Sequence, residues 1–420
     1  TYEDLMRAHP LDAVRARIAD SKAVFAIPAF ATYQAGNVIM TTGFWMQRIA
    51  VGWVTWELKG SEAWLGTVAF AELFPSLLTA LWGGSLADKH DAPKIMFWGQ
   101  IASAAVSVAL ALLYFTGTLT PWAMAGMMAV LGAVSGVLLP ARLSMARHLA
   151  PPKLLSSALA VNSTGFNLSR FLGPALAAGL LVLGSAGLVF TVSAVGFLAL
   201  SIALYRIRNV PSQTQRVPSS QPVNMVGVMR DLMHTPLILG VLMLQLAQGL
   251  LIRPASELFP AYAEVAFGRG EVGLGLLNAA LGIGAIIGAL LMAKAQDGRA
   301  ALLQILTTSA VFALSLLVFA VTSIFWLALA VLLLHGATMS SSNIAALAYV
   351  QLEAPQDRLG RILSLYTIIF RVGPALGAFL FGITAEANGL MTTGVGFALA
   401  GLLATGGLAL FILKPRNQYQ

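Results

Sequence analysis

The longest uncharged stretch of this sequence, residues 300–352, reads AALLQILTTSAVFALSLLVFAVTSIFWLALAVLLLHGATMSSSNIAALAYVQL. It contains 53 residues without an Asp, Glu, Lys or Arg, whereas a helix needs about 20 apolar residues to cross a bilayer. The stretch is therefore too long for one crossing, and the polar pair Thr322-Ser323 lies near its middle. It predicts a helical hairpin that crosses a membrane twice.

The rest of the chain repeats this pattern. Of its 420 residues 58% are hydrophobic and 10% are charged, compared with about a quarter charged in soluble domains, which argues against a soluble enzyme. The apolar runs are continuous, unlike the alternating strands of about 10 residues in a membrane β-barrel. We therefore predict an all-α membrane protein with twelve spans, at about 24–57, 63–86, 94–116, 121–147, 154–183, 187–206, 233–265, 272–293, 300–320, 324–350, 360–385 and 390–413.

Basic residues orient these spans. Eighteen of the 25 Lys and Arg fall on the side with both termini, and two, Lys59 and Arg269, fall on the other side. Because loops rich in Lys and Arg stay in the cytoplasm, both termini are expected there. The net charge of +8 is then a property of topology and does not indicate nucleic-acid binding.

The chain reads as two related halves. Residues 61–66 (SEAWLG) align with 270–275 (GEVGLG) at an offset of 209, and Gly173-Pro174-Ala-Leu recurs as Gly373-Pro374-Ala-Leu at an offset of 200. Repeated units are common in transporters, with the substrate site between them. We predict a cytoplasmic segment (1–23), a six-helix bundle (24–206), a cytoplasmic linker (207–232), a second six-helix bundle (233–413) and a cytoplasmic tail (414–420).

The loop after the second span reads Gly84-Ser-Leu-Ala-Asp88-Lys89-His-Asp91-Ala-Pro-Lys94. It resembles the Gly-x-Leu-Ala-Asp-Arg-x-Gly-Arg-Lys signature of the major facilitator superfamily, with Lys89 in place of Arg and Asp91 in place of the second Gly. The resemblance covers the whole chain and implies two pseudo-symmetric six-helix bundles with alternating access.

The same resemblance implies a cytoplasmic gate. Asp88, supported by Gly84 and Lys89, would hold the start of span 11 near Arg361, and a degraded copy with Asp297 and Arg299 lies in the second half. A carboxylate at a helix N-terminus is stabilising by about 0.3–1 kcal/mol. The alternative is a loop that only sets topology.

Two further segments are similar to one branch of the superfamily, the bacterial exporters of enterobactin and macrolides. They are residues 45–61, from Trp45 to Ser61, and residues 253–260, from Arg253 to Pro260. This resemblance implies export from a bacterial cytoplasmic membrane. The sequence contains no phosphate loop for ATP, so the expected energy source is an ion gradient. Members of the branch export chemically different cargoes, so the resemblance does not name the substrate.

Five arginines remain within the spans: Arg48, Arg142, Arg170, Arg253 and Arg371. A charge at the bilayer centre costs roughly 2.5–3.5 kcal/mol on insertion scales, so each needs a wet cavity or a partner. Arg48 and Glu72 lie 12 residues before and after the turn at residue 60, hence both about 18 Å deep. We predict that they make contact or share a water site.

Glu257 corresponds to Arg48 under the offset of 209, and Arg253 precedes it by four residues, a spacing that suits an internal helix pair. We predict that Arg48, Glu72, Arg253 and Glu257 line a central cavity and couple substrate to protons. The alternative is that they are structural ion pairs between helices.

Arg170 and Arg371 precede the Gly-Pro pairs of spans 5 and 11, and proline permits helix bending. We predict that Gly173, Pro174, Gly373 and Pro374 form hinges and that both arginines join the coupling site. The alternative is a packing kink with the arginines bonded to backbone carbonyls. Arg142 lies near the end of span 4 and is expected to extend to the membrane interface.

Five arginines and two central glutamates leave a formal charge of +3 in the cavity, which favours anionic or zwitterionic cargo by complementarity. A siderophore-like or lipid-like anion is expected. Candidate cavity walls are Phe44, Trp45, Trp53 and Phe259, although such residues more often serve ordinary packing than substrate contact.

The sequence offers no cofactor or metal site. The cluster Gly282-Ile-Gly284-Ala-Ile-Ile-Gly288 lacks the context of a dinucleotide loop and fits close helix packing. The five histidines are scattered, and His335 is expected in the core. No catalytic constellation is visible, so we expect a transporter and not an enzyme.

Taken together, the sequence predicts a monomeric exporter, surrounded by lipid, that exchanges protons for a small amphiphilic molecule. The alternatives are a general multidrug efflux carrier and a carrier that flips or takes up lipids or lysophospholipids.

Overall fold

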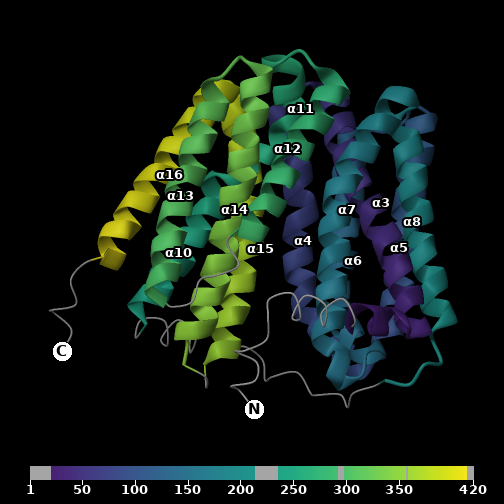
Figure 1. The fold of residues 1–420 in the computed structure, drawn as a ribbon. Coiled ribbons are helices and arrows are strands. Elements are labelled where there is room, and N and C mark those ends of the chain that lie inside the picture. Colours follow the sequence, from purple (N-terminus) through teal and green to yellow (C-terminus); the bar gives the residue numbers. More distant parts are fainter. Residues whose placement is uncertain (1–19, 213–234, 292–297, 356–357, 414–420) are drawn as a thin grey trace.

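The computed structural model describes residues 20–212, 235–291, 298–355 and 358–413, and every regular element in them is a helix. Figure 1 shows two bundles side by side. The first contains α3 (Pro28–Lys59), α4 (Glu62–Lys89), α5 (Ala92–Phe115), α6 (Pro121–Leu149), η1 (Pro152–Leu154), α7 (Leu155–Leu183) and α8 (Ala186–Arg206). The second contains α10 (Pro236–Leu251), η2 (Arg253–Leu258), α11 (Phe259–Ala261), η3 (Tyr262–Ala266), α12 (Gly270–Leu291), α13 (Gly298–Val321), α14 (Phe325–Glu353), α15 (Leu359–Asn388) and α16 (Leu390–Leu413).

The twelve predicted spans are confirmed as helices in the described parts of the chain. Eleven of them are long and apolar enough to cross a membrane. The twelfth, α3, carries Arg48 and several amides, and Gln34, Asn37 and Gln47 are buried against other helices. Because these polar groups face protein rather than lipid, α3 tolerates a composition that a lipid-facing helix would not.

Local sequence signals set the helix boundaries. The hydroxyls of Ser61, Thr120 and Ser185 accept hydrogen bonds from the first turns of α4, α6 and α8, which satisfies otherwise unpaired N–H groups. Gly60 ends α3 with a φ of 55°, a conformation that glycine adopts without strain. The predicted turn at residue 60 is therefore present.

Small residues let the helices approach closely. A Cβ atom added to Gly284 would lie 2.0 Å from the carbonyl oxygen of Leu333, and one added to Gly288 would lie 2.1 Å from that of Ala337. The glycine cluster of α12 therefore packs against α14, which confirms its predicted structural role.

The seventh span is a broken helix. The chain changes from the α-helix α10 to the 3-10 helix η2, passes the short α11 and ends in the π-helix η3. Pro254 lacks an N–H group for the helical hydrogen-bond pattern. Irregular backbone within a membrane is tolerated where it is buried in protein or lines a cavity, and transporter sites are commonly built on such breaks.

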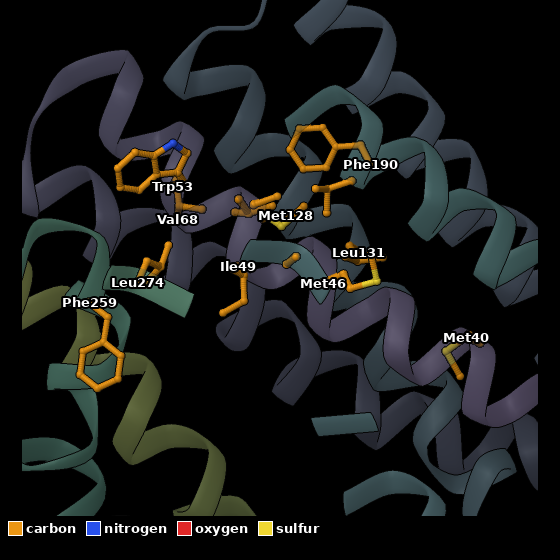
Figure 2. Packing of buried hydrophobic residues seen from close by; sticks show 14 of the residues in the cluster. Met40, Met46, Ile49, Trp53, Val68, Met128, Leu131, Phe190, Phe259 and Leu274 are labelled. Atoms are coloured by element: carbon orange, nitrogen blue, oxygen red, sulfur yellow. The ribbon is translucent and has the colours of Figure 1, made fainter. Parts of the chain in front are cut away.

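The two bundles meet at one end of the molecule. We call the end at which α3 begins and α16 ends the terminal end, and the opposite end the far end. The main apolar cluster continues from the first bundle into the second near the far end, where Ile49 and Trp53 lie close to Phe259 and Leu274 (Figure 2). A separate cluster around Ile305 and Tyr349 belongs to the second bundle alone, at the terminal end.

Polar contacts join the same far ends. Glu386 of α15 accepts hydrogen bonds from the Ser61 hydroxyl at 2.8 Å and from the Ala63 N–H at 3.3 Å, at the N-terminus of α4. A Cβ added to Gly66 would lie 2.3 Å from the carbonyl oxygen of Ala378. The bundles are thus in direct contact at the far end.

Candidate functional site: a cationic cavity between the bundles

A cavity of about 540 Å³ lies between the bundles at mid-length. Its walls come from α3, α4, α5, α6, α7, α8, α12 and α15 together with the broken span. This volume suits a small organic ligand. All five predicted intramembrane arginines and both central glutamates line it.

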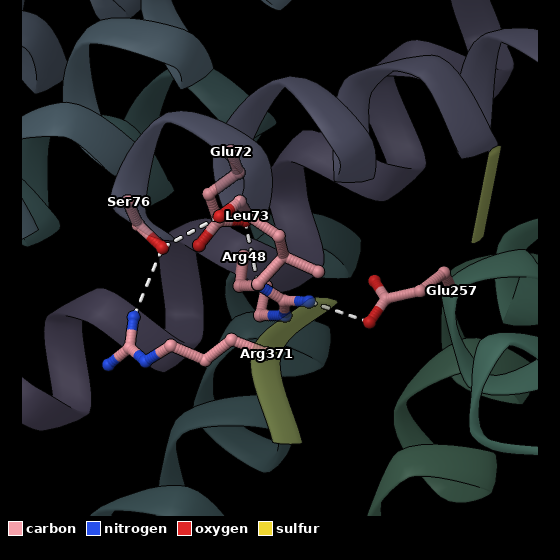
Figure 3. Close-up of polar contacts among 6 residues, drawn as sticks. All are labelled: Arg48, Glu72, Leu73, Ser76, Glu257 and Arg371. Atoms are coloured by element: carbon pink, nitrogen blue, oxygen red, sulfur yellow. Dashed lines mark hydrogen bonds and ion pairs between the residues drawn. The ribbon is translucent and has the colours of Figure 1, made fainter. Parts of the chain in front are cut away.

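Arg48 lies between two carboxylates (Figure 3). Its guanidinium is 2.6 Å from Glu72 Oε2 and 2.6 Å from Glu257 Oε1. The contact predicted between Arg48 and Glu72 is confirmed. The second ion pair joins the bundles, because Arg48 belongs to α3 and Glu257 to η2. The three side chains are only 13–23% exposed, so little water screens the interaction.

Arg253 does not pair with Glu257, contrary to the internal pair that their spacing suggested. They lie in the 3-10 helix η2, where residues three apart eclipse and residues four apart diverge. Arg253 instead donates hydrogen bonds to Asn343 and, at 3.3 Å, to Gln245, and it lies over the Phe370 ring at 4.4 Å.

Arg170 and Arg371 reach the cavity from α7 and α15. Arg371 donates a hydrogen bond to the Ser76 hydroxyl of α4 at 3.0 Å (Figure 3). The Arg170 guanidinium lies over the Trp45 ring at 5.6 Å. In the described residues neither has an ion pair with a carboxylate.

Arg142 also faces the cavity, so the expectation that it extends to the membrane interface was wrong. It donates a hydrogen bond to the Thr41 hydroxyl at 2.9 Å and lies over the Phe166 ring at 5.6 Å. Its α6 helix turns this residue toward α3 and α7 rather than toward lipid. Periodicity alone could not distinguish these faces, because most neighbours of Arg142 are apolar.

Two of the four predicted aromatic walls are correct. Phe44 and Trp45 line the cavity, whereas Trp53 and Phe259 do not. Trp53 donates to Glu57 at 2.8 Å, and Phe259 is buried in the core. Sequence reasoning missed Ser76, Asn343, Phe166 and Phe370. A signal was available for Asn343, which ends the polar run Ser341-Ser342-Asn343 within an uncharged span.

The gate and hinge roles remain predictions. Asp297 and the side chain of Asp88 lie outside the part of the chain that the structure describes. The other gate residues lie at the terminal end, with Gly84 and Lys89 in α4, Arg299 in α13 and Arg361 in α15.

The predicted hinges lie in continuous helices. Pro174 and Pro374 are inside α7 and α15. A Cβ added to Gly173 would lie 2.4 Å from Trp45 Cβ, and one added to Gly373 would lie 3.1 Å from Gly249 Cα. Both glycines therefore permit close packing, against α3 in one bundle and α10 in the other, as expected for related halves.

His335 is buried, with Nδ1 2.7 Å from the Ser315 hydroxyl, which confirms its core location. Among the described residues no cluster of His, Asp or Glu has the composition of a metal site.

The paired bundles and the cavity between them define a secondary transporter of the major facilitator superfamily. The chain belongs to the family of transmembrane secretion effectors, whose family model matches residues 19–418. It is 24% identical over 376 residues to the staphyloferrin A transporter of Staphylococcus aureus, covering 88% of this chain and 91% of that protein. It is 28% identical over 376 residues to the enterobactin exporter EntS of Escherichia coli, covering 87% and 85%.

The fold is also that of solved transporters. A bacterial homologue of the human lysosomal transporter Spinster, in an inward-facing and unoccupied conformation, superposes with a TM-score of 0.67 at 14% identity, covering 92% of this chain and 97% of that one. The solved structures confirm the predicted fold, and the family model and the two siderophore carriers confirm the predicted family resemblance, so this chain is a multi-pass membrane transporter.

Proposed function

We propose that this transporter exports a small anionic or zwitterionic organic molecule, siderophore-like in chemistry, in exchange for protons across a bacterial cytoplasmic membrane. The observation that carries the proposal is the position of Arg48, bound by Glu72 in its own bundle and by Glu257 in the other. The siderophore carriers among its relatives support the class of cargo.

The charge of the cavity supports an anion over a cation. Five arginines and two glutamates line it, a formal charge of +3 with both carboxylates ionised. Cationic drugs would meet a like charge, which complementarity disfavours. A general multidrug carrier is therefore the weaker proposal.

The Arg48–Glu257 pair would serve as a lock in the proton exchange. In the empty carrier it holds the bundles in the arrangement that is closed at the far end. A proton on Glu257 removes one partner of the pair, and an anionic cargo on Arg48 competes for the other. Either event releases the bundles, whereas the empty, deprotonated carrier stays locked. This rule gives antiport when the outward-open carrier, in which the pair is broken, takes a proton on Glu257 before it returns and releases that proton as the pair re-forms.

The orientation assigns a side to each step. The excess of Lys and Arg supports an orientation with both termini, and hence the terminal end, in the cytoplasm. The far end, where the bundles touch, is then the outer end. Cargo would enter from the cytoplasm, with Asp88 and Arg361 closing the inner gate after it and the Gly-Pro helices bending as hinges.

The test uses proteoliposomes with a trapped pH dye and an imposed proton gradient. Matched anionic and cationic amphiphiles are added to the native protein and to the Glu257→Gln and Glu72→Gln variants. We expect anions to trigger proton flux in the native protein. Glu257→Gln should pass cargo without proton coupling, because the lock is permanently open, and anion-triggered proton flux should fall at least about tenfold.

Glu72→Gln is the matched comparison, because it removes a partner of Arg48 within one bundle and leaves the pair between the bundles. It should keep a larger part of the coupled flux than Glu257→Gln. Proton flux triggered only by cations would refute the proposal, as would full coupling in Glu257→Gln.

A further inference from the structure

Four of the five cavity arginines have no carboxylate partner among the described residues. Within the described part of the chain, Arg48 alone among the five has carboxylate partners. Arg142 and Arg170 come from the first bundle, and Arg253 and Arg371 from the second. Their protein partners are hydroxyls, amides and aromatic rings, which leave the positive charge uncompensated.

The arrangement is costly without a ligand. Arg170, Arg48 and Arg253 line the same cavity, and like charges brought together in one cavity disfavour one another. Two buried donors, Arg253 Nε and Trp45 Nε1, have no hydrogen-bond acceptor in the described structure, although buried polar groups are normally paired. The cavity therefore combines these unpaired donors with an excess of positive charge, and it also holds one unpaired acceptor, Gln100 Oε1.

Aromatic rings hold the guanidinium groups in place. Arg142 lies over Phe166, Arg170 over Trp45 and Arg253 over Phe370, at 5.6, 5.6 and 4.4 Å. Such stacking leaves the N–H groups that are not already bonded to Thr41, Gln245 or Asn343 available for recognition of a carboxylate or a similar oxyanion. The cavity thus contains prepared anion sites in both bundles.

We propose that the cargo carries at least two separate acidic groups, one bound in the first bundle by Arg142 and one bound in the second by Arg253. This inference rests on the proposed export of organic anions and names the cargo class more closely. A monoanion would leave two of the three formal positive charges uncompensated, whereas a dianion leaves one and a trianion leaves none. Such a cargo would bridge the bundles.

The experiment measures binding by calorimetry to the full-length protein in lipid nanodiscs at neutral pH. The probes are straight-chain dicarboxylates of about five to ten carbon atoms and the monomethyl ester of each. Every pair has the same chain and differs by one negative charge. We expect an optimal length at which the diacid binds at least about tenfold more tightly than its monoester, because two linked contacts reinforce each other.

Arg142→Gln and Arg253→Gln separate bridging from simple charge attraction. Each variant removes one anchor. The affinity for the diacid of optimal length should therefore fall about tenfold, to the affinity of its monoester. The monoester can use either site and should lose only about twofold. Arg142→Lys and Arg253→Lys keep the charge and should recover part of the diacid affinity. Arg269→Gln is the control, because this arginine lies over Phe325 outside the cavity.

Equal affinity for diacids and monoesters at every length would overturn the inference. It would also be overturned if the two Gln variants lost as much affinity for the monoester as for the diacid. Absence of diacid binding to the native protein would also overturn it. Anion-triggered proton flux together with equal affinities would leave the proposed export intact. Flux triggered only by cations, without diacid binding, would refute both.

Discussion

Arg48 is the residue on which both carboxylates of the cavity converge. Removing one partner of a buried ion pair leaves an uncompensated charge and costs roughly 3–5 kcal/mol, whereas removing all partners together costs much less. The depth argument that located Arg48 and Glu72 used only helix rise and a turn position. It could not place Arg253, because nothing in the spacing of residues 253 and 257 indicates a 3-10 helix.

A stability measurement tests this view of Arg48. Arg48→Gln leaves Glu72 and Glu257 facing each other without a cation. We expect this variant to lose on the order of 3–5 kcal/mol of unfolding free energy, the largest loss among single variants of this network. Adding Glu72→Gln and Glu257→Gln should restore much of the loss. Thermal unfolding in detergent gives the comparison. A triple variant no more stable than Arg48→Gln would argue against the ion-pair network.

At the scale of elements, the helices were predictable and their irregularities were not. Twelve apolar runs indicate twelve helices because a bilayer demands about 20 apolar residues for each span. The seventh run, 233–265, reads as one span, yet Pro254 and its neighbours form η2 and redirect Arg253 toward α14. The direction in which the Arg142 side chain points also depends on the rotation of α6 about its own axis. Packing against neighbouring helices sets that rotation.

The contact between α15 and α4 yields a prediction at this scale. Glu386 accepts from the Ser61 hydroxyl and the Ala63 N–H at the start of α4, where a carboxylate also interacts favourably with the helix dipole. Glu386→Ala should weaken this closure. The native chain has no cysteine, so Asn278→Cys in the cavity gives a single labelling site.

A membrane-impermeant maleimide applied from the outside should label Asn278→Cys several-fold faster in the Glu386→Ala background. Glu264→Ala is the matched control, because Glu264 is another far-end acid and lies within the second bundle. An unchanged labelling rate in Glu386→Ala would exclude a closing role for this contact.

The whole molecule combines a symmetric scaffold with an asymmetric site. The repeated Gly-Pro pairs indicate two related bundles, and Gly173 and Gly373 occupy corresponding packing positions. The charges do not follow that symmetry, since Arg48 in one half corresponds to Glu257 in the other. Pairing across the cavity depends on how the bundles dock, and no local pattern encodes that.

The uncompensated charge of the cavity also has an electrical consequence. Bacterial cytoplasmic membranes are negative inside, and each elementary charge that crosses about 100 mV gains or loses roughly 2.3 kcal/mol. A cavity that selects anions therefore selects cargo that the voltage itself drives outward. With a potassium gradient and an ionophore setting the voltage in proteoliposomes, dicarboxylate efflux should rise as the interior becomes more negative, and more steeply than monoester efflux. For anionic cargo, the arginines would then favour molecules whose export the membrane voltage assists.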